Sequence, residues 1–520
     1  MALHYAIDSV AVNGRMLFGW GWCFSDQIAH DEVQLKLEYA DGAIAWLKCQ
    51  SHITRVDVLS SYPSSRHSVS SGFRFSATSN ADLTSAKVYL YLMMHNGSWE
   101  NIQVPDFLPA TENEFEKKRA EKSKKKELYD FFEGIPSEAP SASLLIDHAM
   151  GGGANIVSER WSREWLDAGN ALLSLRFHVS RLAYELQYLD AAHSRNVFVA
   201  DFKLLVPFLD KVPLAGIEVN SLVSYPDFFG ILKFIIKQKT GKALPLKYHV
   251  HDFHSLCDSW SLLNQHENFC ELPAPSICHK CMASRSEVFP ALRNLTGIKD
   301  WRSQWRKFLA VCDTIQFFSD SSKLMFQQIY KDTVSSGKLL VSPHESLLFL
   351  EESVRPVLGD PHVIGVVGNI SIAKGANILR DMARLILKEQ LPLRIVVIGN
   401  VETYEPSEAY FSTGSYVREA LPGLLEKHRV GICFLPSICP ETFSFVASEV
   451  MQLQFPFGCF NLGAQAERIG SYDHGFIVDE PTAEAALKRI LKIVGEGQAG
   501  SNTFAGQIKT VNNPAGIVEA

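Results

Sequence analysis

Two kinds of segment are missing from this 520-residue sequence. No apolar run approaches the roughly 18–20 residues that cross a bilayer. The first residues, from Met1 to Tyr5, lack the basic stretch followed by an apolar stretch that marks a secretory signal. We therefore expect a cytoplasmic protein, with peripheral attachment at the inner face of the membrane left open.

A strong excess of charge is missing as well. The chain has 50 basic and 57 acidic residues, for a net charge of −7. This mild acidity argues against a surface built to bind nucleic acid, but it leaves room for a local site that takes an anionic ligand. The 33 Gly and 23 Pro are near ordinary usage, which excludes collagen-like and low-complexity classes. The length predicts about three domains at roughly 100–200 residues each.

Cysteine is unevenly spread. Four of the ten cysteines crowd into one short stretch: Cys257, Cys270, Cys278 and Cys281. Disulfides rarely persist in the cytoplasm, and a Cys-x-x-Cys with two further cysteines nearby is typical of a tetrahedral structural Zn²⁺ site. An iron–sulfur cluster, a redox pair at Cys278 and Cys281, and plain thiols are the alternatives. The site would hold together an insertion over residues 254–285.

The N-terminal part has a β pattern. Short β-type runs separated by Asn-Gly and Asp-Gly turns predict an antiparallel β-sandwich over residues 1–108. Trp20 and Trp22 share one face of a strand and are interpreted as sandwich core, whereas a carbohydrate-binding role stays open for the module as a whole. A charged linker follows over residues 109–142, read as a solvated helix rather than a basic membrane-surface patch.

The remainder of the chain alternates strands with helices. This alternation predicts two Rossmann-like α/β domains with parallel sheets, over residues 143–350 and 351–496, and a polar tail over 497–520. In such sheets, ligands bind at the loops that follow the strands. The residues directly after each predicted strand are therefore the candidates for function.

The second α/β half carries a pair of glutamates in such a position. Glu441 lies in the loop after the predicted strand 431–435, and Glu449 lies inside the next helix. The turn between them presents free backbone N–H groups and the positive end of a helix, which suits a phosphate. The flanking carboxylates would suit the hydroxyl groups of two sugars. Taken alone, the pair would be ordinary helix and surface acids.

Lys374 is the matching cation. It follows a strand and the loop residues Gly368 and Asn369, and it comes directly before a helix. Lys374 and the two glutamates together resemble the motifs of the retaining glycosyltransferases of the GT-B fold (the family 4-like group). That family is marked by two Glu separated by seven residues.

The resemblance implies roles for these residues. Glu441 would contact the transferred sugar, Glu449 would hold the nucleotide ribose, and Lys374 would neutralise the diphosphate. The backbone of the loop that receives the diphosphate would come from Thr442, Phe443, Ser444 and Phe445. Asn369 departs from the family, because many members carry Arg after the first glycine, and this puts a second cationic contact in doubt.

Two motifs of the first α/β half match the same family. The glycines that follow its first strand resemble the loop that lines the cleft near the donor phosphates and the acceptor: Gly151, Gly152 and Gly153. His251 and Asp252 end a later strand, where the family places a His-Asp that faces the reaction centre; a strand-end cap is the structural alternative. Some relatives also share the His-Asp and cysteine arrangement.

The function implied by the resemblance is retaining transfer of a hexose-type sugar from a nucleotide sugar to a glycan or lipid-linked glycan acceptor. Surface polysaccharide synthesis (O-antigen, capsule or exopolysaccharide) is the expected setting. No catalytic divalent metal and no nucleic-acid partner are expected, and a membrane or assembly partner is left open. The alternative is a catalytically inactive GT-B scaffold that binds glycans through the β-sandwich.

Overall fold

The computed structural model divides the chain into two compact units, Met1–Pro343 and His344–Ala520. No helix in the part of the chain that it describes is long and apolar enough to cross a membrane. The described residues are 3–13, 16–39, 41–65, 67–78, 86–105, 107, 114–136, 141–284, 297–344 and 357–499.

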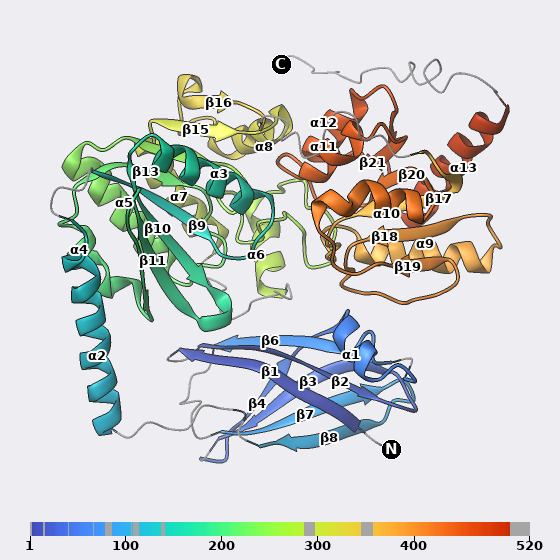
Figure 1. Cartoon of the computed structure of the whole chain (residues 1–520), viewed down its shortest axis with the longest axis horizontal. Helices are drawn as coiled ribbons and strands as arrows, with labels where there is room; N and C mark the ends of the chain where they lie inside the picture. Colours follow the sequence, from blue (N-terminus) through green and yellow to red (C-terminus); the bar gives the residue numbers. More distant parts are fainter. Residues whose placement is uncertain are drawn as a thin grey trace. The chain divides into compact units, whose positions relative to one another are not determined.

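The first unit begins with two four-stranded antiparallel sheets, which we call the two-sheet module (Figure 1). One sheet has the order β1 (Leu3–Asn13), β2 (Met16–Ser25), β6 (Gly72–Thr78), β5 (Gln50–Ile53). The other has the order β4 (Ile44–Lys48), β3 (His30–Glu38), β7 (Lys87–Met94), β8 (Trp99–Val104). Buried residues from both sheets form one apolar core, which includes Leu35, Phe73 and Leu90.

Two of the predicted hairpin turns are confirmed. Gly42 and Gly97 have φ values of +81° and +82°, and they connect β3 to β4 and β7 to β8, both of which pair antiparallel. These turns need a residue that adopts positive φ without strain.

The interpretation of Trp20 and Trp22 as core between the sheets is wrong. Strand alternation turns Leu17 and Cys23 into the core of the module, and it turns the tryptophans to the opposite face of β2. There Trp20 packs on the apolar core of the following α/β domain, and Trp22 lies 5.7 Å, ring to ring, from Tyr62 beside α1 (Val56–Ser61). This face of the first sheet is therefore covered.

Helix α2 (Glu114–Glu133) occupies most of the predicted linker. The segment is rich in Lys and Glu, which are good helix formers. Its C-terminal part is more than a solvated linker, because Leu128 and Phe131 are buried in the core of the α/β domain.

The α/β domain of the first unit is built on an eight-stranded sheet. Its central strand β9 pairs parallel with β10 and β13, whereas β11 and β12 continue it as an antiparallel hairpin. In spatial order the strands are β12 (Ser194–Val199), β11 (Ala183–Leu189), β10 (Ala171–His178), β9 (Ala142–His148), β13 (Leu214–Val219), β14 (Leu246–His249), β15 (Thr314–Phe317) and β16 (Leu339–Val341).

Amphipathic helices cover this sheet. Side-chain caps begin two of them: Asp227 accepts from the Gly230 N–H at α5, and Ser319 accepts from the Ser322 N–H at α8. Aromatic side chains of α7, above all Trp301 and Trp305, are fully buried against α5. The helices are α3 (Gly153–Asp167), α5 (Phe228–Lys242), α6 (Pro275–Ser284), α7 (Ile298–Val311) and α8 (Asp320–Tyr330).

The second unit is a six-stranded parallel sheet with helices between its strands. In spatial order the strands are β19 (Tyr410–Ser412), β18 (Arg394–Ile398), β17 (Asp360–Val367), β20 (Val430–Leu435), β21 (Phe457–Phe460) and β22 (Gly475–Val478). Numbered along this unit, the order is third, second, first, fourth, fifth, sixth, as in a Rossmann fold. The prediction of a parallel α/β sheet in this half is confirmed.

Helices connect the strands of the second unit, as the predicted alternation requires. They are α9 (Ala376–Lys388), α10 (Leu421–Lys427), α11 (Phe445–Gln452), α12 (Gly463–Gly470) and α13 (Ala483–Ala499), and a short 3₁₀ turn (Arg418–Ala420) precedes α10. Helix α12 was not predicted, because a glycine stands at each of its ends and its apolar pattern is short.

Candidate functional site

The strand order of the second unit places two loops next to each other. Strands β17 and β20 are neighbours, although 67 residues lie between their ends at Val367 and Leu435 in the sequence. At this point the order of the sheet reverses direction, which leaves a crevice beyond the carboxyl ends of the two strands. The predicted donor-site residues lie in the two loops and helices that leave these ends.

Direct packing joins the two loops. Gly375 has a φ of +89°, and a Cβ atom there would lie 2.1 Å from the Pro436 carbonyl oxygen, so only glycine fits. The Ile438 N–H donates to the Ala373 carbonyl at 3.1 Å. Lys374, between these two contact points, is half-buried beside the loop after β20.

The charge of Lys374 affects the pKa of groups in the loop after β20 and in α11. Burial raises the pKa of the Cys439 thiol to about 12, with Glu441 acting in the same direction and Lys374 opposing them. Burial also raises the pKa of Glu449, and both Arg418 and Lys374 oppose this shift. Lys374 therefore acts electrostatically on both ends of the predicted site.

Glu441 is held at its main chain and at its side chain. The Ser437 hydroxyl donates to its Oε1 at 2.6 Å. The Glu441 N–H donates to Oε1 of Gln465 at 2.8 Å, and Gln465 Nε2 donates to the Cys439 carbonyl at 2.8 Å. Gln465 is fully buried in α12, so it closes a two-bond clamp on the loop that carries Glu441.

The segment from Thr442 to Phe445 leads into α11. Ser444 has a φ of +72°, which is strained for a residue other than glycine. It makes no side-chain cap on the helix, and its buried hydroxyl has no hydrogen-bond partner within the described ranges. Among the described residues, the Ser444 side chain therefore supplies no acceptor to the first N–H groups of α11.

Arg468 supports this segment from α12. Its guanidinium donates to the carbonyls of Phe443 at 3.1 Å and Ser444 at 2.6 Å, and to the Ser448 hydroxyl at 2.8 Å. It also lies 4.0 Å from the centre of the Phe443 ring. Burial lowers its pKa to about 10, so it stays protonated at neutral pH. A fixed positive charge therefore lies beneath the start of α11.

Glu449 is almost fully buried and forms an ion pair. Arg418 Nε donates to its Oε1 at 2.6 Å. Burial raises the pKa of Tyr416 to about 12, and the nearby Glu449 carboxylate adds to this shift. Glu449 is therefore a positioned acid rather than a surface one.

The departure at Asn369 is visible in the structure. Gly368 has a φ of +110°, and Asn369 is exposed beyond it, where its Oδ1 accepts from Asn400 Nδ2 at 3.1 Å. No cation stands at this position. The cations that the sequence reasoning missed, Arg418 and Arg468, lie on later elements, and only their place in the fold shows their relation to the site.

In the first unit, the glycine loop follows the central strand β9. Gly151 and Gly152 have φ values of +78° and +88°, and a Cβ atom at either would meet nothing within 4 Å. The glycines are needed here for their conformation, and the space beside them is open. Helix α3 then begins at Gly153 without a side-chain cap.

The buried Asp147 fixes this loop. Its Oδ2 accepts from Asn155 Nδ2 at 2.8 Å and from the Ser158 hydroxyl at 2.6 Å, and its Oδ1 accepts from the His148 N–H at 2.8 Å. The start of α3 is thereby tied to the end of β9.

His251 and Asp252 lie just beyond β14. The His251 ring stacks on Phe318 with 4.4 Å between centroids. Asp252 accepts from the Ser221 hydroxyl at 2.7 Å and from the His254 N–H at 2.9 Å. Both carboxylate oxygens of Asp252 are thus used to hold its turn.

His249 is the neighbour that the sequence reasoning missed. It is fully buried, its Nε2 lies 2.5 Å from Glu218 Oε2, and its ring is 4.3 Å from that of Trp161. Burial lowers the pKa of His249, against the opposing effect of Glu218. The alternating strand pattern Tyr248–His251 could have indicated this residue.

The predicted zinc site does not appear in the structure. Within the described ranges, no group of three or more His, Cys, Asp or Glu is placed to hold a metal ion. The Cys257 thiol donates to Asp258 Oδ1 at 3.3 Å, and the Cys278 thiol, on α6, donates to the Pro273 carbonyl at 3.6 Å. Cys270 and Cys281 complete the predicted set without forming a ligand cluster. The zinc prediction is therefore not supported, because the described residues bring no three of these ligands together.

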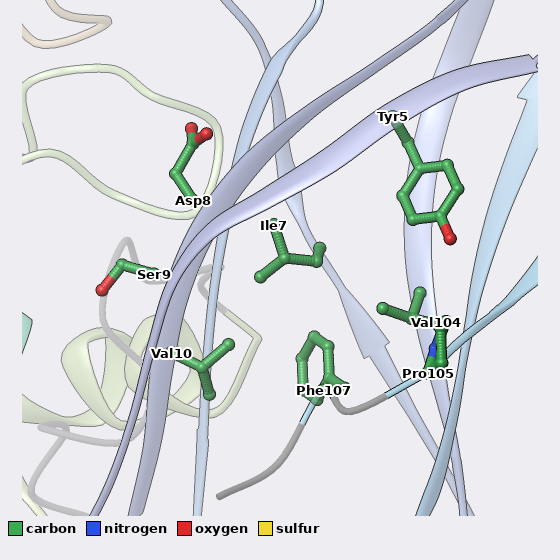
Figure 2. A pocket seen from close by; sticks show the side chains of 8 residues that line it. All are labelled: Tyr5, Ile7, Asp8, Ser9, Val10, Val104, Pro105 and Phe107. Atoms are coloured by element: carbon green, nitrogen blue, oxygen red, sulfur yellow. The ribbon is translucent and has the colours of Figure 1, made fainter.

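Two hollows lie away from these residues. Figure 2 shows one of about 460 Å³ at an edge of the two-sheet module, where Ile7, Val10 and Phe107 turn toward one another and Asp8 points away. The other, of about 380 Å³, lies at the amino ends of β17 and β18 beside Arg394. This second hollow lies at the amino ends of the strands, whereas Glu441 lies beyond the carboxyl ends. Neither hollow therefore belongs to the candidate site.

Residues 351–502 match the family model of the glycosyl transferases group 1. This match lies entirely in the second unit and covers less than a third of the chain. The second unit therefore carries the sequence pattern of a glycosyl transferase group 1 domain.

The capsular polysaccharide biosynthesis glycosyltransferase CapM of Staphylococcus aureus is 25% identical over 154 residues, which are 28% of this chain and 40% of CapM. The chain thus spans two fifths of that relative. Among solved structures, Anabaena HepE in complex with UDP and glucose aligns with a TM-score of 0.42 and 14% identity, over 69% of this chain and 91% of HepE. The catalytic domain of Arabidopsis thaliana starch synthase IV, bound to ADP and acarbose, aligns with a TM-score of 0.40 and 9% identity, over 70% and 93% of the two chains.

Proposed function

We propose that this protein is a retaining GT-B glycosyltransferase that moves a hexose-type sugar from a nucleotide sugar to a glycan acceptor. One observation carries the proposal: Lys374, Glu441 and Glu449 lie on the loops and the helix that follow the neighbouring strands β17 and β20, at the reversal point of a parallel sheet. The match of residues 351–502 to the glycosyl transferases group 1 supports it from the sequence.

The donor diphosphate would lie at the start of α11. The uncapped N–H groups there, the strained Ser444 and the positive end of the helix favour an anion. Lys374, which acts on Glu449, and the buried Arg468, which donates to the Ser444 carbonyl, would add two positive charges near the segment. This arrangement compensates for the missing cation at Asn369.

Transfer breaks the bond between the anomeric carbon of the sugar and a phosphate oxygen, and it forms a bond from that carbon to an acceptor hydroxyl oxygen. Negative charge develops on the departing diphosphate, so Lys374 and the α11 amides would lower the barrier most. Glu441, held by Ser437 and Gln465, would orient the sugar. Glu449 would accept from ribose hydroxyls with the carboxylate oxygen that Arg418 leaves unused.

The first α/β domain (143–350) would hold the acceptor, and residues 351–496 would hold the donor. The open space beside Gly151 and Gly152 suits a ligand that approaches the backbone closely. His251 would contact the transferred sugar, whereas Asp252 would act as a positioning residue because its oxygens hold the turn. Residues 1–108 would form an accessory β-sandwich.

Synthesis of a surface polysaccharide is the proposed setting, and the similarity to CapM of S. aureus supports it. One observation favours a second candidate, a GT-B scaffold without catalysis that binds glycans through the two-sheet module: Asn369 stands where a cation is common in the resembled family. The two candidates differ in whether the donor is cleaved.

A donor panel distinguishes them. The full chain is incubated with UDP-, GDP- and dTDP-sugars, and nucleoside diphosphate release is measured with and without a chelator. We expect release from one donor that persists with the chelator and is lost in Glu441→Gln. If no donor is cleaved, or if Glu441→Gln cleaves as fast as the wild type, the proposal fails.

A further inference from the structure

The second sheet of the two-sheet module has an outward face rich in aromatic side chains. Alternation along β3 and β7 buries Leu35 and Leu90 and turns Tyr89 and Tyr91 outward. On the flanking strands β4 and β8, Trp46 is 51% exposed and Trp99 is 44% exposed. Strands β4, β3, β7 and β8 form one layer of the module (Figure 1).

Three of these rings form a continuous row across the sheet. The centroids of Trp46 and Tyr91 are 4.8 Å apart, and those of Tyr91 and Trp99 are 6.4 Å apart. The rings meet at steep angles of 71° and 63°, which leaves parts of their faces open. We call Trp46, Tyr91 and Trp99 the aromatic row.

The aromatic row is exposed, in contrast to the outward aromatic side chains of the first sheet. There the outward aromatics Trp20 and Trp22 are packed against other parts of the same unit. Large exposed aromatic side chains that gather on one face of a soluble domain indicate a binding surface.

Four of the charged groups beside the aromatic row form ion pairs, and the exposed Lys87 is the cross-strand partner of Glu38. Lys36 pairs with Glu38, and Lys48 Nζ lies 3.2 Å from Glu32 Oε2. The Lys36 ammonium also lies 5.9 Å from the centre of the Trp46 ring. Because the charges largely cancel, the face is complementary to a neutral ligand and offers little to a polyanion or a polycation.

Hydrogen-bonding side chains are interleaved with the rings. Gln34 and Asn101 are the cross-strand partners of Tyr91, and Gln103 is the partner of Tyr89. Asn101 and Gln103 are exposed. Side-chain amides can donate to and accept from hydroxyl groups, whereas a flat aromatic ring can pack against the C–H groups of a ligand.

We infer that the aromatic row is a binding site for a neutral glycan chain. A pyranose ring has an apolar C–H face that stacks on Trp or Tyr and an equatorial rim of hydroxyl groups that amides bind. A row of three rings fits successive sugars of one chain better than a single sugar. This site is separate from the proposed donor site, and the inference does not depend on transferase activity.

Affinity gel electrophoresis of the full chain tests it. The gels contain dextran, hydroxyethylcellulose, mannan or galactan as neutral probes and alginate as an anionic one. We expect at least one neutral probe to retard the wild type, and the double variant Trp46→Ala/Trp99→Ala to bind at least about tenfold more weakly. Trp46→Phe/Trp99→Phe keeps flat rings and should retain most of the binding.

Two controls separate this site from others. Phe411→Ala removes an aromatic side chain of similar exposure (46%) in the second unit and should bind as the wild type does. Glu441→Gln should also bind, even if it fails in donor cleavage. The inference is overturned if no neutral probe retards the wild type, if the alanine double variant binds unchanged, or if alginate binds best. It is also overturned if the double variant only converts a dimer to a monomer, since the face would then be a protein interface.

Discussion

Replacing Gln465 with methionine tests whether the clamp on the Glu441 loop matters for catalysis. Gln465 is fully buried, accepts from the Glu441 N–H at 2.8 Å and donates to the Cys439 carbonyl at 2.8 Å. Methionine has nearly the same volume, so the change removes both hydrogen bonds without opening a large cavity.

The size of the effect follows from what is left behind. One buried N–H and one buried carbonyl lose their partners, and each such group costs about 1–3 kcal/mol. The free energy of unfolding of the second unit should therefore fall by about 2–6 kcal/mol. If the loop shifts to reach water, Glu441 is displaced, and kcat should fall by about 10–100-fold.

Three measurements check this reasoning on the full chain. Urea unfolding gives the stability, donor turnover gives kcat and KM, and hydrogen exchange reports on the Glu441 amide itself. We expect faster exchange at Glu441 and a loss in kcat that exceeds any change in KM for the donor. Gln328→Met, at an exposed position of α8, is the matched control and should leave all three unchanged.

The outcomes are separable. A loss of stability with normal kcat would mean that Gln465 only supports the fold. Unchanged exchange at Glu441 together with wild-type turnover would refute the clamp altogether.

Other predictions concern the donor site. Glu441→Gln should lower transfer by about 10²-fold or more while the melting temperature stays the same, and calorimetry with a transfer assay checks both. Lys374→Met should lower kcat by about 10²-fold because the departing diphosphate loses its cation, and restored turnover with a better leaving group would support this reason. Gly375→Val should unfold the second unit at lower urea, because its Cβ would lie 2.1 Å from the Pro436 carbonyl; normal stability would contradict the close packing. Donor affinity should fall as pH drops through the raised pKa of Glu449, since the protonated acid no longer accepts two hydrogen bonds; titration calorimetry from about pH 5 to pH 8 should show this slope in the wild type and not in Glu449→Gln.

The raised pKa of Glu449 also bears on stability. Its folded-state pKa lies above the usual value, because burial disfavours the carboxylate. Its contribution to stability is therefore fully present below the unfolded pKa and is lost as pH rises through the folded pKa. Glu449→Gln should remove this pH dependence of stability, and urea unfolding at several pH values would check it.

The local pattern of the sequence determined much of the second unit. The predicted strand 431–435 corresponds to β20 (Val430–Leu435), and the predicted alternation of strands and helices is present throughout the unit. Apolar runs and helical periodicity are local signals, so they are readable without the fold. The same reasoning missed β11 and α12, because their patterns are short and their neighbours supply the burial that stabilises them.

Only the tertiary structure decided which residues meet. Lys374 reaches the loop of Glu441 because β17 and β20 are adjacent, and Gln465 clamps that loop from a helix that follows another strand. The spacing of the four cysteines suggested a zinc ligand set, but the spacing does not fix where the thiols point. Strand alternation placed Trp20 and Trp22 on one face, yet the α/β core, not the opposite sheet, covers Trp20. Sequence periodicity reports which side of an element is apolar, whereas the partner that covers it depends on long-range packing.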